Sequence, residues 1–414
     1  MATASQYPRY IRPRIEEALA DTPVVLIHGP RQCGKTTLAR MIGDDAGYAY
    51  ITFDDEIHLT AAIEDPVGFV AELPDKVVLD EVQRAPQLFM SIKAAVDRQR
   101  KPGRFLLTGS ANVLVVPKLA DSLAGRMGIL RLHPLAQCEL ISHRPGFFNA
   151  LFAGKFTFKP GERLGKNLAQ RVISGGYPDA LRRGSSERRA GWYRDYIETL
   201  VQRDISDLAR ISALDALPRL LELAAGQTAR LVNVSELAGP FNLNRKTIRD
   251  YVTLLERVFL LELLPPWHTN RLSRLIKKPK LHLGDTGLAA ALLNFDADGL
   301  MQDRDFFGQL LETFVFQELR RQASWYEKHI AFYHFRDKDG AEVDIVAELG
   351  ARGVAGIEVK ASSTVTGSDF RGLRKLQEVT GKRFLAGVVL YDGDSVARFG
   401  EGLYAVPISA LWEA

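Results

Sequence analysis

Residues 29–36 combine two glycines, a lysine and a threonine at a fixed spacing, directly after an apolar run. They read Gly-Pro-Arg-Gln-Cys-Gly-Lys-Thr, the pattern in which a strand passes through a glycine-rich loop into a helix. Gly29 and Gly34 permit the tight path that turns several N–H groups toward one anion, and the helix adds its positive dipole end. Lys35 would pair with the β- and γ-phosphates, and the Thr36 hydroxyl would bind Mg²⁺. Unless this is a chance glycine turn, it predicts a nucleoside triphosphate site. The loop residues expected to contact the nucleotide are Gly29, Pro30, Arg31, Gln32, Cys33, Gly34, Lys35, Thr36 and Thr37.

A second signal is the run Lys-Val-Val-Leu-Asp-Glu at 76–81, an apolar strand that ends in two acids. At the carboxyl end of a parallel strand, Asp80 would hold Mg²⁺ through water, and Glu81 would polarise the attacking water as a general base. The alternative is an acidic turn at a strand end. The next strand, 104–108, is expected beside it and opens into small polar residues. Those that would sense the γ-phosphate or orient the water are Thr108, Ser110 and Asn112; the alternative is a polar turn.

An arginine follows soon after that strand, in Ser-Leu-Ala-Gly-Arg at 122–126. Arg126 would act as an arginine finger that stabilises charge developing during phosphoryl transfer. A solvated surface arginine is the alternative, and Arg131 is a competing candidate. A finger acting in trans would require a homo-oligomer.

Composition is that of an ordinary globular protein, with 46% hydrophobic and 25% charged residues among 414 and a net charge of +4. The two cysteines, Cys33 and Cys138, exclude a disulfide framework, and because Cys33 lies in the phosphate loop we expect a reducing cytoplasm. No stretch approaches 18 apolar residues, and the first 17 residues lack the apolar segment of a signal peptide. We therefore expect no contact with a membrane.

Apolar runs alternate with amphipathic stretches over the first third of the chain, which is typical of a parallel α/β sheet. The runs are 24–28, 49–53, 76–80, 104–108 and 129–132. The predicted domains are a P-loop ATPase core (1–142), a linker and helical lid region (143–225), a winged-helix-like module (226–292) and a C-terminal α/β domain (300–414).

Several of these motifs together resemble the predicted AAA+ superfamily ATPases of bacteria and archaea. They are residues 29–37, VVLDEVQRAP at 77–86, LLTGS at 106–110, SLAGR at 122–126, GGYP at 175–178 and YIETLVQRDI at 196–205. In that family a P-loop domain is joined to a C-terminal domain of unknown function. The resemblance implies ATP as the nucleotide, Mg²⁺ as its metal, and hydrolysis through Lys35, Thr36, Asp80 and Glu81.

Residues 231–259 are predicted to form two helices around a turn, the arrangement of a helix-turn-helix. Ser235 would cap the first helix and Asn244 the second. The apolar positions of the second helix that follow helical spacing are Ile248, Val252, Leu255 and Phe259. Such a unit would enter the major groove of double-stranded DNA with the exposed residues that begin its second helix: Arg245, Lys246 and Arg249.

A basic stretch follows at 271–280 and contains no acidic residue. It suits a winged-helix hairpin that contacts phosphates. The alternative is a lid or a partner surface with a solvated basic face. Its basic residues are Arg271, Arg274, Lys277, Lys278 and Lys280.

The C-terminal domain places acids and a lysine on two successive strands. Period-2 alternation puts Glu358 and Lys360 on one face, and a hairpin would bring Asp344 close to them. Two carboxylates sharing Mg²⁺ can activate water for phosphodiester attack while a lysine offsets negative charge. Glu312 would supply a further acid. Residues 305–395 thus resemble restriction-endonuclease-like nucleases, with Asp344, Glu358 and Lys360 as catalytic residues; the alternative is an amphipathic strand with charges for solubility.

The sequence as a whole favours a Mg²⁺-dependent AAA+-type ATPase whose nucleotide state drives or gates a DNA-binding winged helix and a nuclease-like domain. One alternative is an ATP-controlled signalling or assembly switch with a catalytically inactive interaction module. A small-molecule kinase is a weaker alternative, because 200 further residues would have no role in it.

Overall fold

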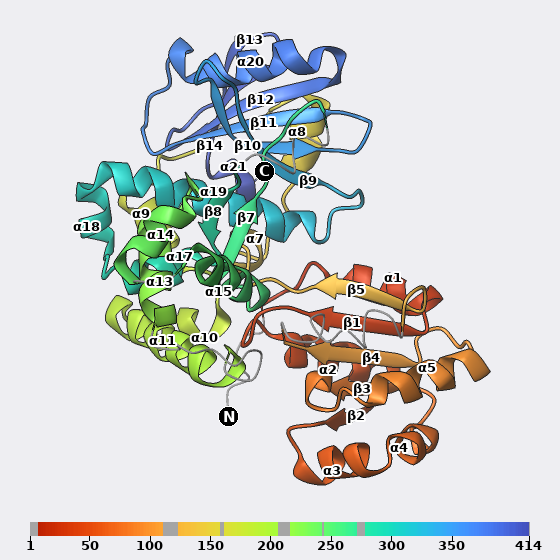
Figure 1. Cartoon of the computed structure of the whole chain (residues 1–414). Helices are drawn as coiled ribbons and strands as arrows, with labels where there is room; N and C mark the ends of the chain where they lie inside the picture. The colour runs from red at the N-terminus through yellow and green to blue at the C-terminus, as the bar shows by residue number, and fades with distance from the viewer. Residues whose placement is uncertain are drawn as a thin grey trace. The chain divides into compact units, whose positions relative to one another are not determined.

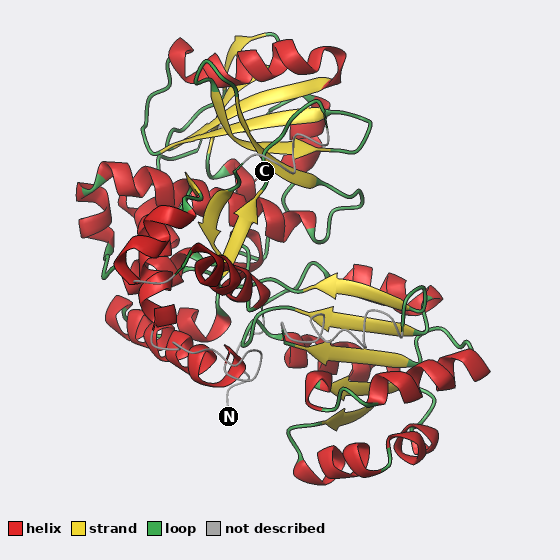
Figure 2. Cartoon of the chain, viewed as in Figure 1, coloured by secondary structure: helices red, strands yellow, loops and turns green. Residues whose placement is uncertain are grey.

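The computed structural model describes residues 7–110, 123–157, 161–205, 216–241, 244–270 and 278–413. The chain forms two compact units. Unit 1 comprises Met1–Leu135 and Arg257–Phe259, and unit 2 comprises Ala136–Glu256 and Leu260–Ala414. Both units combine helices with strands (Figure 2).

Unit 1 is built on a sheet of five parallel strands in the order β2-β3-β4-β1-β5 (Figure 1). The strands are β1 (Val24–His28), β2 (Ala49–Thr52), β3 (Val77–Asp80), β4 (Phe105–Gly109) and β5 (Met127–Arg131). They coincide with the five predicted apolar runs, and β4 lies beside β3, so the predicted parallel α/β sheet is confirmed.

The three central strands β1, β3 and β4 are buried at every residue. Burial on both faces explains why their sequences are continuous apolar runs rather than alternating patterns. Each fully buried Val, Leu or Ile stabilises the fold by about 1.5–3 kcal/mol. The accompanying helices are α1 (Arg12–Asp21), α2 (Lys35–Ala46), α3 (Glu56–Glu64), α4 (Pro66–Glu72) and α5 (Leu88–Arg98), with a 3-10 turn η1 (Val82–Arg84).

Unit 2 begins with a helical layer that ends in a small antiparallel sheet. The helices are α7 (Gln137–Leu140), α8 (Phe147–Ala153), α9 (Lys166–Ser174), α10 (Pro178–Leu181), α11 (Ser186–Thr199), the π-helix η3 (Leu200–Ile205) and α13 (Ala216–Gly226). Next come β6 (Arg230–Leu231), α14 (Val234–Ala238), η4 (Gly239–Phe241), α15 (Arg245–Arg257), β7 (Leu261–Leu264) and β8 (Lys280–Leu283). The three strands pair antiparallel in the order β6-β8-β7.

The helix caps in this region differ in part from those expected. Asn233, not Ser235, caps α14, because its side chain accepts the N–H of Ser235 at 3.2 Å. Asn244 accepts the N–H of Thr247 at 2.8 Å at the start of α15, so its predicted capping role is confirmed. The apolar positions Ile248, Val252 and Leu255 are buried in α15. The prediction was wrong for Phe259, because α15 ends at Arg257 and Phe259 has a left-handed backbone with φ 63°.

The motif at 175–178 and the tyrosines near 193 are explained by a buried ionic cluster. Asp285 accepts the backbone N–H of Gly176 at 2.8 Å, the Tyr193 hydroxyl at 3.1 Å and the Arg321 guanidinium at 2.8 Å. At Gly175 a Cβ would lie 2.0 Å from the Asp285 carboxylate, so only glycine fits. These residues serve packing within unit 2.

The C-terminal part of unit 2 is a six-stranded mixed sheet in the order β13-β14-β12-β11-β10-β9. The strands are β9 (Ala331–Arg336), β10 (Glu342–Glu348), β11 (Val354–Lys360), β12 (Phe384–Tyr391), β13 (Ala397–Gly400) and β14 (Leu403–Pro407). The helices are α17 (Thr286–Leu292), α18 (Ala297–Gln302), α19 (Arg304–Ala323), α20 (Arg371–Thr380) and α21 (Ala410–Glu413), with 3-10 turns η5 (Gly367–Phe370) and η6 (Gly381–Arg383). Helix α19 contacts β11, and α20 packs on β10, β11 and β12.

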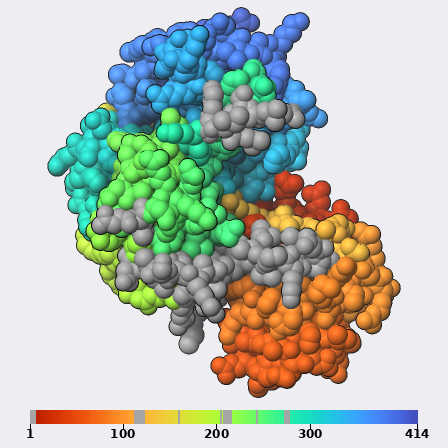
Figure 3. Space-filling view, in the orientation of Figure 1, coloured from red at the N-terminus to blue at the C-terminus, as the bar shows by residue number. Residues whose placement is uncertain are grey.

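The two sheets of unit 2 are joined by backbone hydrogen bonds. The N–H of Trp267 donates to the His334 carbonyl at 2.6 Å, and the N–H of His334 donates to Pro265 at 2.9 Å. In the space-filling view the blue C-terminal residues continue into the cyan and green surface of the same unit (Figure 3). Within the described residues, each helix is too short or too polar to span a bilayer.

Candidate functional site

The phosphate loop runs from the end of β1 into the first turn of α2. Gly29 and Gly34 adopt φ values of 157° and 98°, in the region that side chains rarely reach. A Cβ on Gly29 would also lie 2.1 Å from the Leu132 carbonyl oxygen. Both positions therefore require glycine for backbone reasons.

The Lys35 side chain is folded over this loop and is 4% exposed. Its ammonium donates to the carbonyls of Gly29 at 3.1 Å and Pro30 at 2.7 Å. Cys33 is buried, and its thiol approaches the Leu132 carbonyl at 3.5 Å. Arg9 also holds the loop, since its guanidinium donates to the Cys33 carbonyl at 3.0 Å.

Asp80 lies at the end of β3, and its carboxylate accepts hydrogen bonds from three hydroxyl groups. The Thr36 hydroxyl donates to both carboxylate oxygens at 3.0 Å, and the Tyr50 hydroxyl donates at 2.7 Å. The Thr108 hydroxyl also donates to Asp80. Burial and the hydrogen bond to Asp80 raise the pKa of Tyr50 to about 12, so this hydroxyl remains a donor at neutral pH.

These oxygen donors fit a divalent metal. Thr36 and Asp80 come from α2 and β3, and their side-chain oxygens are 3.0 Å apart. A hydroxyl and a carboxylate are the hard oxygen ligands that Mg²⁺ accepts beside phosphate oxygens. The positions predicted to hold the metal in unit 1 are therefore brought together.

Glu81 follows Asp80 and has a left-handed backbone with φ 58°. Such a conformation is strained for a residue with a side chain and tends to occur at functional sites. Its backbone N–H donates to the Thr108 hydroxyl at 3.2 Å, and Gln83 donates to its carboxylate. The Ser110 N–H donates to Gln83 at 3.3 Å, so Glu81, Gln83 and Ser110 form one polar chain.

The two candidate arginines lie at opposite ends of the edge strand β5. Strand β5 runs parallel to β1, with Val24 opposite Met127 and His28 opposite Arg131. Arg126 therefore lies at the amino-terminal end of β5, whereas the phosphate loop follows the carboxyl end of β1. Arg126 pairs there with Asp97 at 2.6 Å. Arg131 lies at the loop edge, and together with burial its charge and that of Lys35 lower the pKa of His28 to about 3. Asn112 lies outside the described residues.

The predicted C-terminal carboxylates also meet, around the β10–β11 hairpin. Ile345 pairs with Ile357, which brings Asp344 and Glu358 side by side, and their side chains are hydrogen-bonded. Burial and the neighbouring Asp344 raise the pKa of Glu358 well above its usual value. Lys360 is less engaged, since its side chain is 41% exposed and its ammonium is 3.5 Å from Asp369.

A lysine that the sequence placed in the basic hairpin lies among these carboxylates. The Lys280 ammonium is 3.0 Å from Glu312, 2.9 Å from Glu342 and 3.2 Å from Asp344, and its side chain is 3% exposed. Burial lowers the pKa of Lys280, but the three carboxylates more than offset this and hold the pKa well above its usual value. Burial, followed by the Asp344 charge, raises the pKa of Glu312. We call Lys280, Glu312, Glu342, Asp344 and Glu358 the carboxylate–lysine cluster.

This cluster does not fit a metal as Thr36 and Asp80 do. The predicted ligands Glu312 and Asp344 already face an ammonium, and the N–H of Val359 donates to the other oxygen of Asp344 at 3.0 Å. Across the described residues, no three His, Cys, Asp or Glu side chains are arranged to hold a metal ion. A cavity of about 290 Å³ lies beside the cluster, lined in part by Asp344, Glu358 and Arg371.

The basic residues of the helical module are partly solvent-facing. Arg245, Lys246 and Arg249 are exposed on α15, and Lys278 is exposed before β8. Lys280, in contrast, is buried and is not accessible to a phosphate. Arg271, Arg274 and Lys277 lie outside the described residues.

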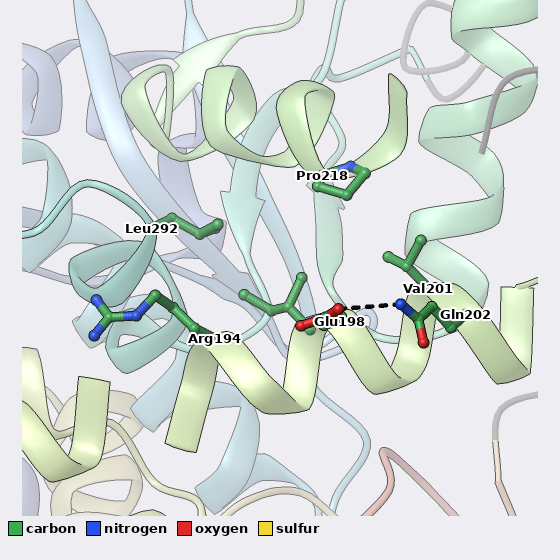
Figure 4. A pocket seen from close by; sticks show the side chains of 7 residues that line it. Arg194, Glu198, Val201, Gln202, Pro218 and Leu292 are labelled. Carbon is green, nitrogen blue, oxygen red and sulfur yellow. Dashed lines mark hydrogen bonds between the residues drawn. The ribbon is translucent and has the colours of Figure 1, made fainter. Parts of the chain in front are cut away.

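Sequence reasoning missed Tyr50, Gln83 and Glu342, as well as the position of Lys280. Gln83 lies within the motif at 77–86, but its contact with Glu81 was not predicted. Tyr50, Glu342 and Lys280 each reach a partner on a different element. A hollow of about 530 Å³ between α11–η3, α13 and α17 had no sequence signal either. It is mainly apolar, and the Gln202 amide donates to Glu198 at 3.1 Å along its wall (Figure 4).

Comparisons with known proteins define the class. Residues 21–141 match the family described as AAA domain, so unit 1 carries an AAA-type ATPase domain. Residues 165–299 and 307–411 match two domains of unknown function, DUF8612 and DUF4143.

The chain is 30% identical over 400 residues to the uncharacterized protein Rv2008c of Mycobacterium tuberculosis and to Mb2031c of Mycobacterium bovis. Each match covers 96% of this chain and 83% of the relative. The chain therefore belongs to the same family as these two mycobacterial proteins.

Similar solved structures are more distant. The Walker-type ATPase PABY2304 of Pyrococcus abyssi is 16% identical with a TM-score of 0.44, covering 69% of this chain and 96% of that one. The RuvB Holliday junction branch migration motor of Thermotoga maritima is 18% identical with a TM-score of 0.28, covering 62% and 89%. The assignment rests on the sequence relatives and the AAA match.

Proposed function

We propose that this protein binds and hydrolyses ATP with Mg²⁺ in unit 1. The observation that carries the proposal is the 3.0 Å contact between the Thr36 hydroxyl and Asp80, beside the glycine loop. When ATP binds, the Lys35 ammonium would donate to the β- and γ-phosphates instead of the loop carbonyls. Thr36 with Asp80 would hold Mg²⁺. Bound Mg²⁺ would neutralise phosphate charge.

Glu81 orients the attacking water in this proposal. Its strained backbone and its hydrogen bond from Gln83 fix the carboxylate near the ends of β3 and β4. The Ser110 N–H, held by Gln83, lies in the same polar chain and would respond to the γ-phosphate. Water activation by a positioned carboxylate contributes about 10²–10⁴-fold to such reactions.

The test is ATP hydrolysis and ATP binding measured on the same preparations. Glu81→Gln is expected to bind ATP with near wild-type affinity yet release phosphate at least about a hundredfold more slowly. Glu72→Gln, an acid on the exposed face of α4, is the matched control. Undiminished hydrolysis in Glu81→Gln would contradict the role of Glu81, and phosphate transfer to a metabolite would favour the kinase alternative.

We further propose that the nucleotide state of unit 1 controls binding of double-stranded DNA by unit 2. The support is the element order α13, β6, α14, α15, β7, β8 and the exposed Arg245, Lys246 and Arg249 at the start of α15. The C-terminal sheet enters as a scaffold rather than as a nuclease, because Lys280 lies against the carboxylates that a metal would need. In an assembly switch, ATP would change protein association and leave DNA affinity unchanged.

DNA affinity measured over a range of salt concentrations tests this second proposal. Replacing Arg249 with alanine removes one phosphate contact and is expected to reduce the slope of log affinity against log salt by about 1. Arg352→Ala, an exposed arginine in the β10–β11 turn, is the control. DNA binding that is equal in both variants and the wild type would exclude α15 as the contact.

An arginine-finger role for Arg126 requires a second copy of the chain. Arg126 lies at the amino-terminal ends of the parallel strands, whereas the phosphate loop of the same chain lies at their carboxyl ends. We therefore include a homo-oligomer in the proposal. Light scattering with and without ATP tests it, and a monomer at all ATP concentrations that still hydrolyses ATP at the full rate would remove Arg126 from the site.

A further inference from the structure

Lys280 is the first residue of β8, and its position is fixed by the small sheet. Its backbone pairs with Leu231 of β6 and Leu264 of β7. Two residues further, the ring of His282 is hydrogen-bonded to the Thr313 hydroxyl of α19 at 3.0 Å. The backbone of Lys280 is therefore held by both neighbouring strands, and its side chain, 3% exposed, is directed into the cluster.

The Lys280 ammonium and the Asp344 carboxylate find all their partners within the protein. An ammonium has three N–H donors, and Lys280 has three carboxylate neighbours, Glu312, Glu342 and Asp344, at 2.9–3.2 Å. The second oxygen of Asp344 accepts a backbone N–H, and Glu358 shares a hydrogen bond with Asp344. Charged groups this deeply buried are stable only when they are paired.

We infer that Lys280 is the resident cation of this cluster and takes the place of a divalent metal, so that unit 2 binds neither Mg²⁺ nor Mn²⁺ at Asp344 while β8 is in the sheet. This inference concerns unit 2 alone and does not depend on ATP hydrolysis in unit 1. It follows that withdrawing the lysine charge leaves several carboxylates facing one another, which is the arrangement that attracts a divalent cation. A metal could therefore bind at Asp344 only when Lys280, a residue of the other sheet of unit 2, is absent or displaced.

Mn²⁺ titration of the full-length chain without nucleotide tests this inference, with free Mn²⁺ followed by electron paramagnetic resonance. The wild type and Asp344→Asn are expected to give the same isotherm. Lys280→Gln, which keeps hydrogen-bond donors but loses the charge, is expected to bind one further Mn²⁺ that the Lys280→Gln/Asp344→Asn double variant loses. Lys278→Gln, an exposed lysine two residues earlier, should behave as the wild type.

Two results would overturn the inference. One is weaker Mn²⁺ binding in Asp344→Asn than in the wild type, which would show a metal at Asp344 beside the intact lysine. This arm needs no lysine variant and so decides the matter even if Lys280→Gln fails to fold. The other is a Lys280→Gln protein with the wild-type circular dichroism spectrum whose Mn²⁺ isotherm and thermal midpoint with Mn²⁺ equal those of the wild type.

Discussion

A buried lysine lies beside the functional candidates of each unit, but its ammonium has different partners in the two. In unit 1, Lys35 donates to the loop carbonyls of Gly29 and Pro30, and hydroxyl groups surround Asp80. In unit 2, Lys280 lies directly against three carboxylates. A lysine held by carbonyls can change partner without leaving a buried charge unpaired, whereas a lysine held by carboxylates cannot. The first arrangement suits a site that acts on an anionic ligand, and the second suits a fixed counter-ion.

The largest effect is expected from Lys280→Met. This change leaves Glu312, Glu342 and Asp344 facing one another without a cation, and we expect unit 2 to lose about 3–5 kcal/mol of unfolding free energy. All four tryptophans of the chain, Trp192, Trp267, Trp325 and Trp412, belong to unit 2, so tryptophan fluorescence during denaturant unfolding reports on it.

Lys35→Met is the matched control for that measurement and should leave the tryptophan transition unchanged, because Lys35 belongs to unit 1. A tryptophan transition that is equally stable in Lys280→Met and the wild type would mean that Lys280 is not the counter-ion of the cluster.

The next effect is expected from Lys35→Ala on ATP turnover. Loss of the ammonium removes a donor to the phosphates as charge develops, and we expect turnover to fall by about 10²–10³-fold. Lys76→Ala is the control, since Lys76 is an exposed lysine that also donates to a carbonyl, that of Ala46 at 3.2 Å. If the two variants hydrolyse ATP equally fast, Lys35 contributes no more to turnover than an exposed lysine, and its ammonium does not act on the phosphates.

A pH-dependent effect should distinguish the two lysines through their neighbouring histidines. Burial and the Lys280 charge lower the pKa of His334 from 6.5 to about 4. Neutral His334 therefore contributes stability that is complete above pH 6.5 and is lost as the pH falls through about 4. Lys280→Met is expected to raise the pKa of His334 in the folded protein, so that this loss is smaller and is complete at a higher pH.

Histidine ring resonances followed against pH by NMR measure this shift. His28, whose low pKa depends on burial, Arg131 and Lys35, should titrate as in the wild type when Lys280 is replaced. An unchanged His334 titration in Lys280→Met would indicate that the ammonium has little influence on its surroundings.

The smallest effect is expected from Tyr50→Phe, which removes one of the hydroxyl donors to Asp80. Thr36 and Thr108 remain, so we expect a loss of only about 1 kcal/mol in the unfolding free energy of unit 1 and a few-fold higher Mg²⁺ requirement for turnover. Circular dichroism and Mg²⁺ dependence of hydrolysis measure the two quantities.

Tyr48→Phe is the control for the Mg²⁺ dependence, because the Tyr48 hydroxyl donates to the Gly103 carbonyl at 2.6 Å and not to Asp80. If both tyrosine variants shift the Mg²⁺ requirement equally, the hydrogen bond to Asp80 does not orient a metal ligand.

Prediction from the sequence worked where the relevant interactions are local. The three central strands of unit 1 are continuous apolar runs because their residues are buried on both faces, and that signal lies within each strand. The loop glycines are similarly local, since a positive φ depends on the residue itself. The cap of α14 was misplaced by two residues because Asn233 and Ser235 are both favoured caps and only the backbone path chooses between them.

The candidate sites were predicted in part. The residues Thr36 and Asp80 were expected together, and they are in contact. Tyr50 could not be found from its surroundings in sequence, because it reaches Asp80 across the pairing of β2 with β3. The roles proposed for Glu81, Arg126 and the C-terminal residues remain predictions.

The sequence by itself determined the phosphate loop, the acidic end of β3 and the parallel sheet. The parallel sheet brings the loop and the acids to the same ends of the strands. Each of these features is encoded by a short pattern of residues with strict requirements on the backbone or on burial. Only the tertiary structure decided the character of the C-terminal cluster. Lys280 stands 32 residues before Glu312 and 64 before Asp344, and packing of the two sheets and α19 in unit 2 brings their charges together. Since the energy of a buried charge depends on which groups surround it, no pattern within one strand could show whether those carboxylates face a metal or a lysine.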